Sequence, residues 1–305
     1  MDATKTVYLA AKGYETQLAE ELFRAHLPLL WQRGGLFGTA SSAVPLAWAQ
    51  NTWFSPVFIP IVSIGDGAEK LRSLQRNWAC TPHDFFRRAA LVQAKLPAIG
   101  KKPFVFGSSP PESPMGGWTL WDKDTVLASA DTANPFPGGR IDFAENTKQP
   151  PNRAYLKLWE VFTLSGKRPA PGELCLDLGS SPGGWTWVLA SLGAKVFSVD
   201  KAELAPQIAI MPGVHHCAGC SAFSLEPENA GKVDWLFWDV ACYPSRLWTM
   251  IKRWLEKGSC RNFVCTLKFQ HKTDFETMDR FVAVPGSRLI HLSHNKHELT
   301  WLRLT

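Results

Sequence analysis

The sequence predicts an α/β protein built around a mostly parallel sheet, and two observations support this fold class. From residue 154 onward, apolar strand-like runs alternate with helical runs, as in LCLDLG, WTWVLASLG and KVFSVD. Such alternation is typical of a parallel, doubly wound sheet. The last two strand-like runs, RLIHLS and HELTWLRL, are separated only by the polar segment HNK. That connection is too short for a crossover helix, so these two strands should form a terminal antiparallel hairpin.

The first half of the chain predicts a second, smaller α/β domain. A strand-like run, TVYLAA, is followed by an amphipathic helical run, ETQLAEELFRAHL. The later stretch ANPFPGGRIDFAENTKQPPNR is rich in Pro, Gly and Asn, which is typical of loops and linkers. We therefore expect an N-terminal domain at residues 1–130, a linker at 131–152 and the larger domain at 153–305.

The composition is that of a soluble globular protein. Hydrophobic residues make up 45% and charged residues 20% of the 305 positions, and no apolar run reaches the ~18 residues that a membrane span needs. The N-terminal stretch lacks the pattern of a signal peptide. Seven cysteines without framework spacing indicate reduced thiols and a cytoplasmic protein. The net charge of +6 permits nucleic-acid binding without requiring it.

A glycine-rich turn, LDLGSSPGGWT, follows the first strand of the larger domain. A dinucleotide-binding turn needs a second glycine two residues after Gly179, where this sequence has Ser181. A P-loop needs a lysine after the last glycine, but Trp185 follows Gly184. Pro182 suits the first position of a helix, with Ser181 as its N-cap. The turn therefore predicts a ligand other than a dinucleotide or a nucleoside triphosphate.

S-adenosylmethionine (SAM), which carries no phosphate, suits this turn. Gly183 and Gly184 should leave bare backbone at the strand end for such a ligand. Asp200 ends the next strand, where a carboxylate can accept both ribose hydroxyls of an adenosyl group. Asp177 lies on the first strand, near enough to orient the loop or the methionine end of the ligand.

Four charged residues stand at positions where charge is costly. Asp239 and Lys268 end apolar strands, Glu298 opens the last strand, and Lys157 lies on the helix that leads into the domain. Charges at apolar strand ends are unfavourable unless they meet one another. We therefore expect the four to converge on one cleft. Burial and a neighbouring cation would depress the pKa of one lysine, which could then orient or deprotonate a ribose 2′-hydroxyl.

The same stretches resemble a known family. NRAYLKLWE, CLDLGSSPGGWTW, VFSVDKAELA, WDV, TLKFQHK and NKHELTW are similar to the FtsJ-type ribose 2′-O-methyltransferases, and within them to the RlmM branch, which methylates a cytidine ribose of large-subunit ribosomal RNA. The resemblance covers residues ~130–305. It implies a Rossmann-like class I SAM-dependent methyltransferase fold. The implied catalytic set is Lys157, Asp239, Lys268 and Glu298, with Lys268 as the proton acceptor.

The resemblance also implies a cofactor site and partners. The residues implied in SAM binding are Asp177, Gly179, Ser181, Pro182, Gly183, Gly184, Trp185, Asp200, Cys220 and Asp239. The family usually has an aspartate near the adenine, whereas this stretch reads AGCSAF, with Cys220 in that place. The implied partner is 23S ribosomal RNA or a precursor particle, bound in part by a THUMP-like N-terminal domain. A monomer that binds no membrane is expected.

Three other interpretations are open at this point. Cys242 follows Asp239 by three residues, as in the D-x-P-C arrangement of cytosine-5 methyltransferases, although Ala241 replaces the proline. The segment HHCAGC, from His215 to Cys220, has zinc-ligand residue types but no second C-x-x-C to complete a site. A SAM- or RNA-binding module without catalysis is the third.

Overall fold

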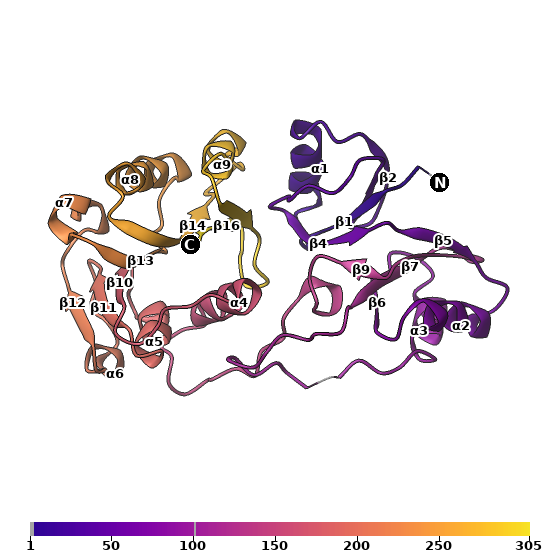
Figure 1. Ribbon diagram of the computed structural model, residues 1–305, viewed down its shortest axis with the longest axis horizontal. Coiled ribbons are helices and arrows are strands. Elements are labelled where there is room, and N and C mark those ends of the chain that lie inside the picture. The colour runs from indigo at the N-terminus through magenta and orange to yellow at the C-terminus, as the bar shows by residue number, and fades with distance from the viewer. Residues whose placement is uncertain (1–2, 101) are drawn as a thin grey trace. The chain divides into compact units, whose positions relative to one another are not determined.

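The computed structural model describes residues 3–100 and 102–305 and divides the chain into two compact units (Figure 1). These are Met1–Ala144 and Glu145–Thr305. The division falls inside the stretch 131–152 that the sequence analysis assigned to a linker. The beginning of that stretch forms strand β9 (Asp131–Thr132), which pairs with β4 in the first unit.

The first unit has two sheets among its described residues. Their strand orders are β2-β3-β1-β4-β9, which is antiparallel throughout, and β5-β8-β7-β6, in which β6 and β7 are parallel. The elements are β1 (Thr6–Ala10), α1 (Glu15–Arg24), β2 (Leu29–Arg33), β3 (Leu36–Thr39), β4 (Ala49–Phe54), β5 (Val57–Pro60), α2 (Ile64–Leu74), β6 (Trp78–Cys80), α3 (Phe86–Gln93), β7 (Gly116–Asp122), β8 (Thr125–Ser129), β9 and the 3₁₀ turn η1 (Pro137–Gly139).

Apolar side chains explain how the helices of this unit pack. Leu71 of α2 and Val92 of α3 are fully buried in one cluster with Trp78 and Trp118 of the four-stranded sheet, so both helices cover that sheet. The strand and helix expected at the start of the chain are confirmed as β1 and α1. A THUMP-like character of this unit stays a prediction.

The second unit contains one seven-stranded sheet with the order β12-β11-β10-β13-β14-β16-β15. The first five strands in this order, β12, β11, β10, β13 and β14, are parallel. Strand β16 lies between β14 and β15 and is antiparallel to both. This confirms the mostly parallel sheet and its terminal antiparallel hairpin. The elements are α4 (Tyr155–Ser165), β10 (Leu174–Leu178), α5 (Gly184–Ser191), β11 (Lys195–Val199), α6 (Pro206–Ala209), β12 (Val214–Cys217), η2 (Ala222–Ser224), α7 (Pro227–Ala230), β13 (Val233–Trp238), α8 (Pro244–Lys257), β14 (Cys260–Lys268), α9 (Phe275–Val282), β15 (Ser287–Ile290) and β16 (Glu298–Arg303).

Helices cover both faces of this sheet. Helices α4 and α5 lie on one side, and α8 and α9 lie on the other (Figure 1). Most residues of the central strands β10, β13 and β14 are therefore buried, and β10 and β13 are largely apolar. The chain order of the strands reverses between β10 and β13. Ligands of such sheets bind outside the carboxyl ends of the strands at this switch point.

The expected N-cap of α5 is wrong. The helix begins at Gly184 with Gly183 as its N-cap residue, and the Ser181 side chain instead donates to the carbonyl of Glu203. The backbone at Gly183 has φ +113°, a conformation that glycine adopts without steric cost. The glycine therefore sets the start of the helix, two residues later than the serine would.

The expectation of reduced thiols is wrong for two cysteines. Cys217 and Cys220 form a disulfide. Strand β12 ends at Cys217, and Gly219, at φ +71°, turns the chain so that the two Cα atoms lie 5.8 Å apart, within the usual ~4.4–6.8 Å range. Two sulfurs bonded to each other offer no thiolate to zinc. The other cysteines are free: Cys80, Cys175, Cys242, Cys260 and Cys265.

Among the described residues, none of the helices has the length and apolar character needed to cross a membrane.

Candidate active site

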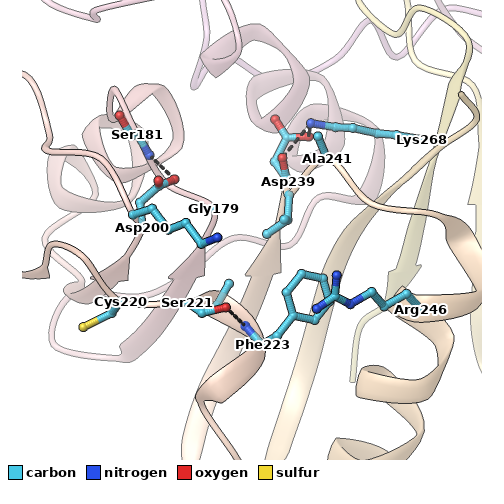
Figure 2. Close-up of a pocket in the computed structure, with 13 residues that line it drawn as sticks. Gly179, Ser181, Asp200, Cys220, Ser221, Phe223, Asp239, Ala241, Arg246 and Lys268 are labelled. Carbon is cyan, nitrogen blue, oxygen red and sulfur yellow. Dashed lines mark hydrogen bonds and ion pairs between the residues drawn. The ribbon is translucent and has the colours of Figure 1, made fainter.

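A cavity of about 470 Å³ opens at the carboxyl ends of the central strands, at the switch point of the sheet (Figure 2). This volume is within the range of small-molecule sites, ~300–1,000 Å³. The residues that line it are Gly179, Ser181, Asp200, Lys201, Cys220, Ser221, Ala222, Phe223, Asp239, Val240, Ala241, Arg246 and Lys268.

The four charges singled out in the sequence meet at one end of this cavity. The Nζ atom of Lys157 lies 2.6 Å from Oε1 of Glu298 and 3.6 Å from Oδ1 of Asp239. The Nζ atom of Lys268 lies 2.9 Å from the same Asp239 oxygen and donates to the Asp239 carbonyl at 2.6 Å. The four charges therefore converge, as expected from the sequence, and Asp239 joins the two lysines.

The sheet register explains part of this geometry. Lys268 and Glu298 are direct partners in the antiparallel pairing of β14 with β16, so their side chains share one face of the sheet. Asp239 directly follows the neighbouring strand β13, and Lys157 comes from the first turn of α4. Four elements distant in sequence thus supply one charge each.

Exposure differs within the cluster. Lys157 and Glu298 are buried, whereas the side chain of Lys268 is 27% exposed and lines the cavity. Burial lowers the pKa of Lys157, but the Asp239 and Glu298 carboxylates outweigh it, so the pKa is raised. The depressed lysine pKa expected from the sequence is therefore wrong for Lys157. Lys157 is a permanent cation that holds two carboxylates, and Lys268 is the lysine that can reach a ligand.

Asp200 stands at another part of the cavity wall. Its Oδ2 accepts the backbone N–H of Ser181 at 3.0 Å (Figure 2). Its Oδ1 accepts the N–H of Ala202 at 2.9 Å. Each carboxylate oxygen keeps a lone pair for another donor. A carboxylate fixed in this way at the end of the second parallel strand suits the two hydroxyls of a ribose.

The end of the glycine-rich turn packs against protein. A Cβ on Gly184 would lie 2.1 Å from the side-chain oxygen of Asn152, and one on Gly183 would lie 2.8 Å from Cγ2 of Ile208. The bare backbone expected there for a ligand is therefore filled by side chains. Trp185 is buried and donates its indole N–H to the Ala154 carbonyl.

Half of the residues expected to bind the cofactor line the cavity, and the other half do not. The residues in the cavity wall are Gly179, Ser181, Asp200, Cys220 and Asp239. Those outside the wall are Asp177, Pro182, Gly183, Gly184 and Trp185. Of the turn, only Gly179 and Ser181, near its start, therefore line the cavity.

Asp177 is a fully buried carboxyl group beneath the turn. Its Oδ2 accepts the hydroxyl of Thr186 at 2.6 Å, which ties β10 to the first turn of α5. Burial raises the pKa of Asp177 to about 7, and the nearby Asp239 and Asp200 charges act in the same direction, against the hydrogen bond from Thr186. The group supports the turn without reaching the cavity surface.

Replacing Asp177 with asparagine is expected to weaken the pH dependence of stability. The folded protein keeps the Asp177 proton up to about pH 7, whereas an unfolded chain releases it near pH 4. This contribution to stability is therefore present below about pH 4 and is lost as the pH rises through 7. The free energy of unfolding, measured with urea between pH 4.5 and 7.5, should fall more steeply in the wild type, by up to about 1.4 kcal/mol per pH unit. Parallel curves for the two proteins would contradict this.

Phe223 and Arg246 are among the residues of the cavity wall that the sequence analysis missed. The guanidinium carbon of Arg246 lies 3.6 Å from the centroid of the Phe223 ring, and both residues line the cavity. Phe223 belongs to the turn η2, and Arg246 to the first turn of α8. The signal available in the sequence was a basic residue just after the start of the helix that follows Asp239.

Cys242, the residue of the rival covalent mechanism, is buried and does not line the cavity. Burial raises the pKa of its thiol, against the smaller opposing effect of a hydrogen bond with Trp238. A cysteine nucleophile needs the thiolate, so this environment disfavours that role.

The strand order, the antiparallel β16 and the cavity at the switch point define the second unit as a class I methyltransferase fold. Residues 150–274 match the family described as FtsJ-like methyltransferase. This part of the chain is therefore an FtsJ-like methyltransferase domain.

Curated relatives point to the same family. The chain is 35% identical over 187 residues to "Ribosomal RNA large subunit methyltransferase M" of Halorhodospira halophila, a match that covers 59% of this chain and 54% of the relative. It is 32% identical over 201 residues to the protein of that name from Alkalilimnicola ehrlichii, covering 60% and 55%. The chain thus spans about half the length of these relatives. A solved magnesium protoporphyrin IX methyltransferase from Synechocystis with bound SAM is 14% identical, at a TM-score of 0.37, over 50% of this chain and 79% of that one.

Proposed function

We propose that this protein is a SAM-dependent ribose 2′-O-methyltransferase that acts on large-subunit ribosomal RNA, with a cytidine as the target. The observation that carries the proposal is one cavity with Asp200 in its wall and the cluster of Lys157, Asp239, Lys268 and Glu298 at one end. The reaction needs a carboxylate that accepts the ribose hydroxyls of SAM. It also needs a lysine that accepts the proton of the RNA 2′-hydroxyl.

SAM fits the donor set of the cavity. Asp200 would accept the hydroxyls of its ribose, and the backbone of Gly179 and Ser181 would lie beside it. Asp177 and Thr186 hold the turn in place from below. Bound SAM supplies an electrophilic methyl group on a sulfonium sulfur.

Lys268 is the residue proposed to handle the proton. It lines the cavity, and its amine can orient a ribose 2′-hydroxyl and accept the proton that the oxygen loses as it is methylated. Asp239 fixes the Lys268 amine through Oδ1 and through its carbonyl. Lys157 and Glu298 in turn fix Asp239 from the buried side, which keeps the reacting groups in position.

The RNA partner is proposed from the relatives and the charge. The curated relatives are named as large-subunit ribosomal RNA methyltransferases, and the net charge of +6 favours binding to phosphates. We assign RNA binding to the unit Met1–Ala144 as a THUMP-like domain. The protein would act as a monomer in the cytoplasm, on 23S RNA or its precursor particle.

Nucleoside mass spectrometry tests this function. Unmodified 23S RNA would be incubated with SAM and the wild type, Lys268→Ala or Cys242→Ala. We expect 2′-O-methylcytidine with the wild type and with Cys242→Ala, and none with Lys268→Ala. The Cys242 variant is a matched control, because it removes the nucleophile that the covalent mechanism requires.

Two results would replace the proposal with another function. A ring-methylated cytosine that needs Cys242 and survives in Lys268→Ala would establish the covalent mechanism. Measured SAM binding without methylation of naked RNA or of precursor particles would favour a non-catalytic binding module.

A further inference from the structure

Glu160 is a buried carboxylate near the charge cluster, and the proposed reaction has not used it. The residue is 2% exposed. It lies three positions after Lys157 on α4, so the two side chains leave the helix on the same face. Burying a carboxylate is costly unless the group is hydrogen-bonded. The hydrogen bonds that Glu160 accepts therefore indicate what it holds in place.

Ser293 donates to Glu160 with both its main chain and its side chain. Its backbone N–H lies 3.0 Å from Oε1 and 2.9 Å from Oε2 of the carboxylate, and its hydroxyl donates to Oε1 at 2.9 Å. Both carboxylate oxygens act as acceptors, which is the role of an ionised group. Hydrogen bonds of this charge-assisted kind are stronger than neutral ones. Glu160 thus fixes the position of Ser293 against α4.

Ser293 belongs to the loop that leads into β16. Residues 291–297 join β15 to β16, and β16 begins at Glu298, whose carboxylate lies 2.6 Å from the Lys157 amine. The loop is longer than the about two to five residues that are typical of β-hairpins. Longer loops have more conformational freedom unless side chains hold them. The position of Glu298, the first residue of the strand, therefore depends on how this loop is held.

Other hydrogen bonds join the end of the loop to the sheet. The backbone N–H of Glu298 donates to the Lys296 carbonyl at 2.7 Å, and that of Phe269 donates to the His297 carbonyl at 3.0 Å. These bonds connect the loop to β16 and to the residue after β14. The contact with Glu160 instead connects it to α4, the helix that carries the lysine of the ion pair.

We propose that Glu160 is a positioning residue for methyl transfer, which holds the 291–297 loop on α4 so that Glu298 stays at the Lys157 amine. This inference rests on the proposed function. Glu160 does not line the cavity, so it acts through the ion pair and not on the ligand. A displaced loop would move the carboxylate of that pair and, through the cluster, the amine that accepts the proton. A misplacement of about 1 Å can slow an enzymatic reaction about 100-fold.

Single-turnover methylation of unmodified 23S RNA tests the inference, together with calorimetry of S-adenosylhomocysteine (SAH), the demethylated product of SAM. Glu160→Gln keeps the shape of the side chain but replaces one acceptor oxygen with an amide donor. It should slow transfer about 10- to 100-fold, while the affinity for SAH stays within about twofold of wild type, because the cavity wall is unchanged. Ser293→Ala removes only the hydroxyl donor and should slow transfer about threefold.

A double variant shows whether Glu160 acts through Glu298. In Glu298→Gln the carboxylate of the ion pair is already absent. Adding Glu160→Gln to this background should therefore slow transfer by less than about a further twofold. A residue that supports the fold independently of the ion pair would give the same factor in both backgrounds.

Asn262→Ala is the matched control for stability. Asn262 is buried in β14, about 20 Å along the strand from Lys268. Its side chain donates to the Asp234 carbonyl and accepts the Thr305 N–H, each at 3.0 Å. The variant should lower the midpoint of thermal unfolding, as Glu160→Gln does, but it should leave the rate of transfer within about twofold of wild type.

The outcomes separate this inference from the function it rests on. A folded wild type that binds SAH but methylates no ribose would overturn both. Normal transfer by the wild type without slowing in Glu160→Gln would overturn the positioning role alone. Equal factors in the two backgrounds, or a loss of SAH affinity as large as the loss of rate, would also overturn it. If Glu160→Gln does not fold, the same criteria apply to Ser293→Ala.

Discussion

Replacing Lys157 with methionine should strongly lower both the rate of methyl transfer and the stability of the protein. The variant leaves the Glu298 carboxylate buried without its cation, which lies 2.6 Å away in the wild type. Removing one partner of a buried ion pair costs about 3–5 kcal/mol. Asp239 also loses one of its two lysines, and the resulting displacement of Lys268 should slow transfer about 100-fold or more. Urea denaturation and single-turnover methylation measure the two effects.

A double variant separates folding from catalysis. Lys157→Met with Glu298→Met removes both buried charges, and replacing a buried pair with apolar groups is often neutral. Stability should therefore recover to within about 1 kcal/mol of wild type, whereas transfer should stay slow. Recovery of transfer together with stability would contradict a positioning role. The exposed pair Lys252–Glu256 on α8 is the control, since Lys252→Met should change stability by less than about 0.5 kcal/mol.

Replacing Gly179 with alanine should also destabilise the protein strongly, because the site has no space for a side chain. Gly179 has φ +83°, and an added Cβ would lie 2.6 Å from Cγ2 and 2.9 Å from the backbone N of Val240. Relieving that contact means moving the backbone next to Asp239. We expect a loss of about 1–3 kcal/mol beyond the conformational cost, with weaker SAH binding in calorimetry.

Gly172→Ala provides a matched control for this prediction. Gly172 has φ +84°, nearly the same as Gly179, but its Cβ would meet no atom within 4 Å. It should therefore show the conformational cost alone, about 1 kcal/mol. Equal losses in the two variants would show that the close approach to Val240 does not matter.

The sequence predicted those features that depend on local pattern. The alternation of strands and helices, the terminal hairpin and the four charges at element ends were all readable, because each depends on the residues of one element and its neighbours. The convergence of Lys157, Asp239, Lys268 and Glu298 followed from the rule that charges at apolar strand ends must meet.

Other features depend on contacts between distant segments and could not be read in this way. The packing of Asn152 on Gly184 and of Ile208 on Gly183 joins parts of the chain whose proximity no local pattern indicates. The stacking of Arg246 on Phe223 brings η2 together with α8. The shift of the N-cap from Ser181 to Gly183 depends on the positive φ of the glycine, which the residue types did not reveal.

The position of β16 determines when the charge cluster can be completed during synthesis of the chain. Because β16 lies between β14 and β15, the strand that carries Glu298 can enter the sheet only after both of its neighbours have been translated. A nascent chain that has left the ribosome as far as Lys268 already has Lys157 and Asp239, but it lacks the second carboxylate that neutralises the buried lysine. Such a chain should be unable to modify RNA while it is still being synthesised.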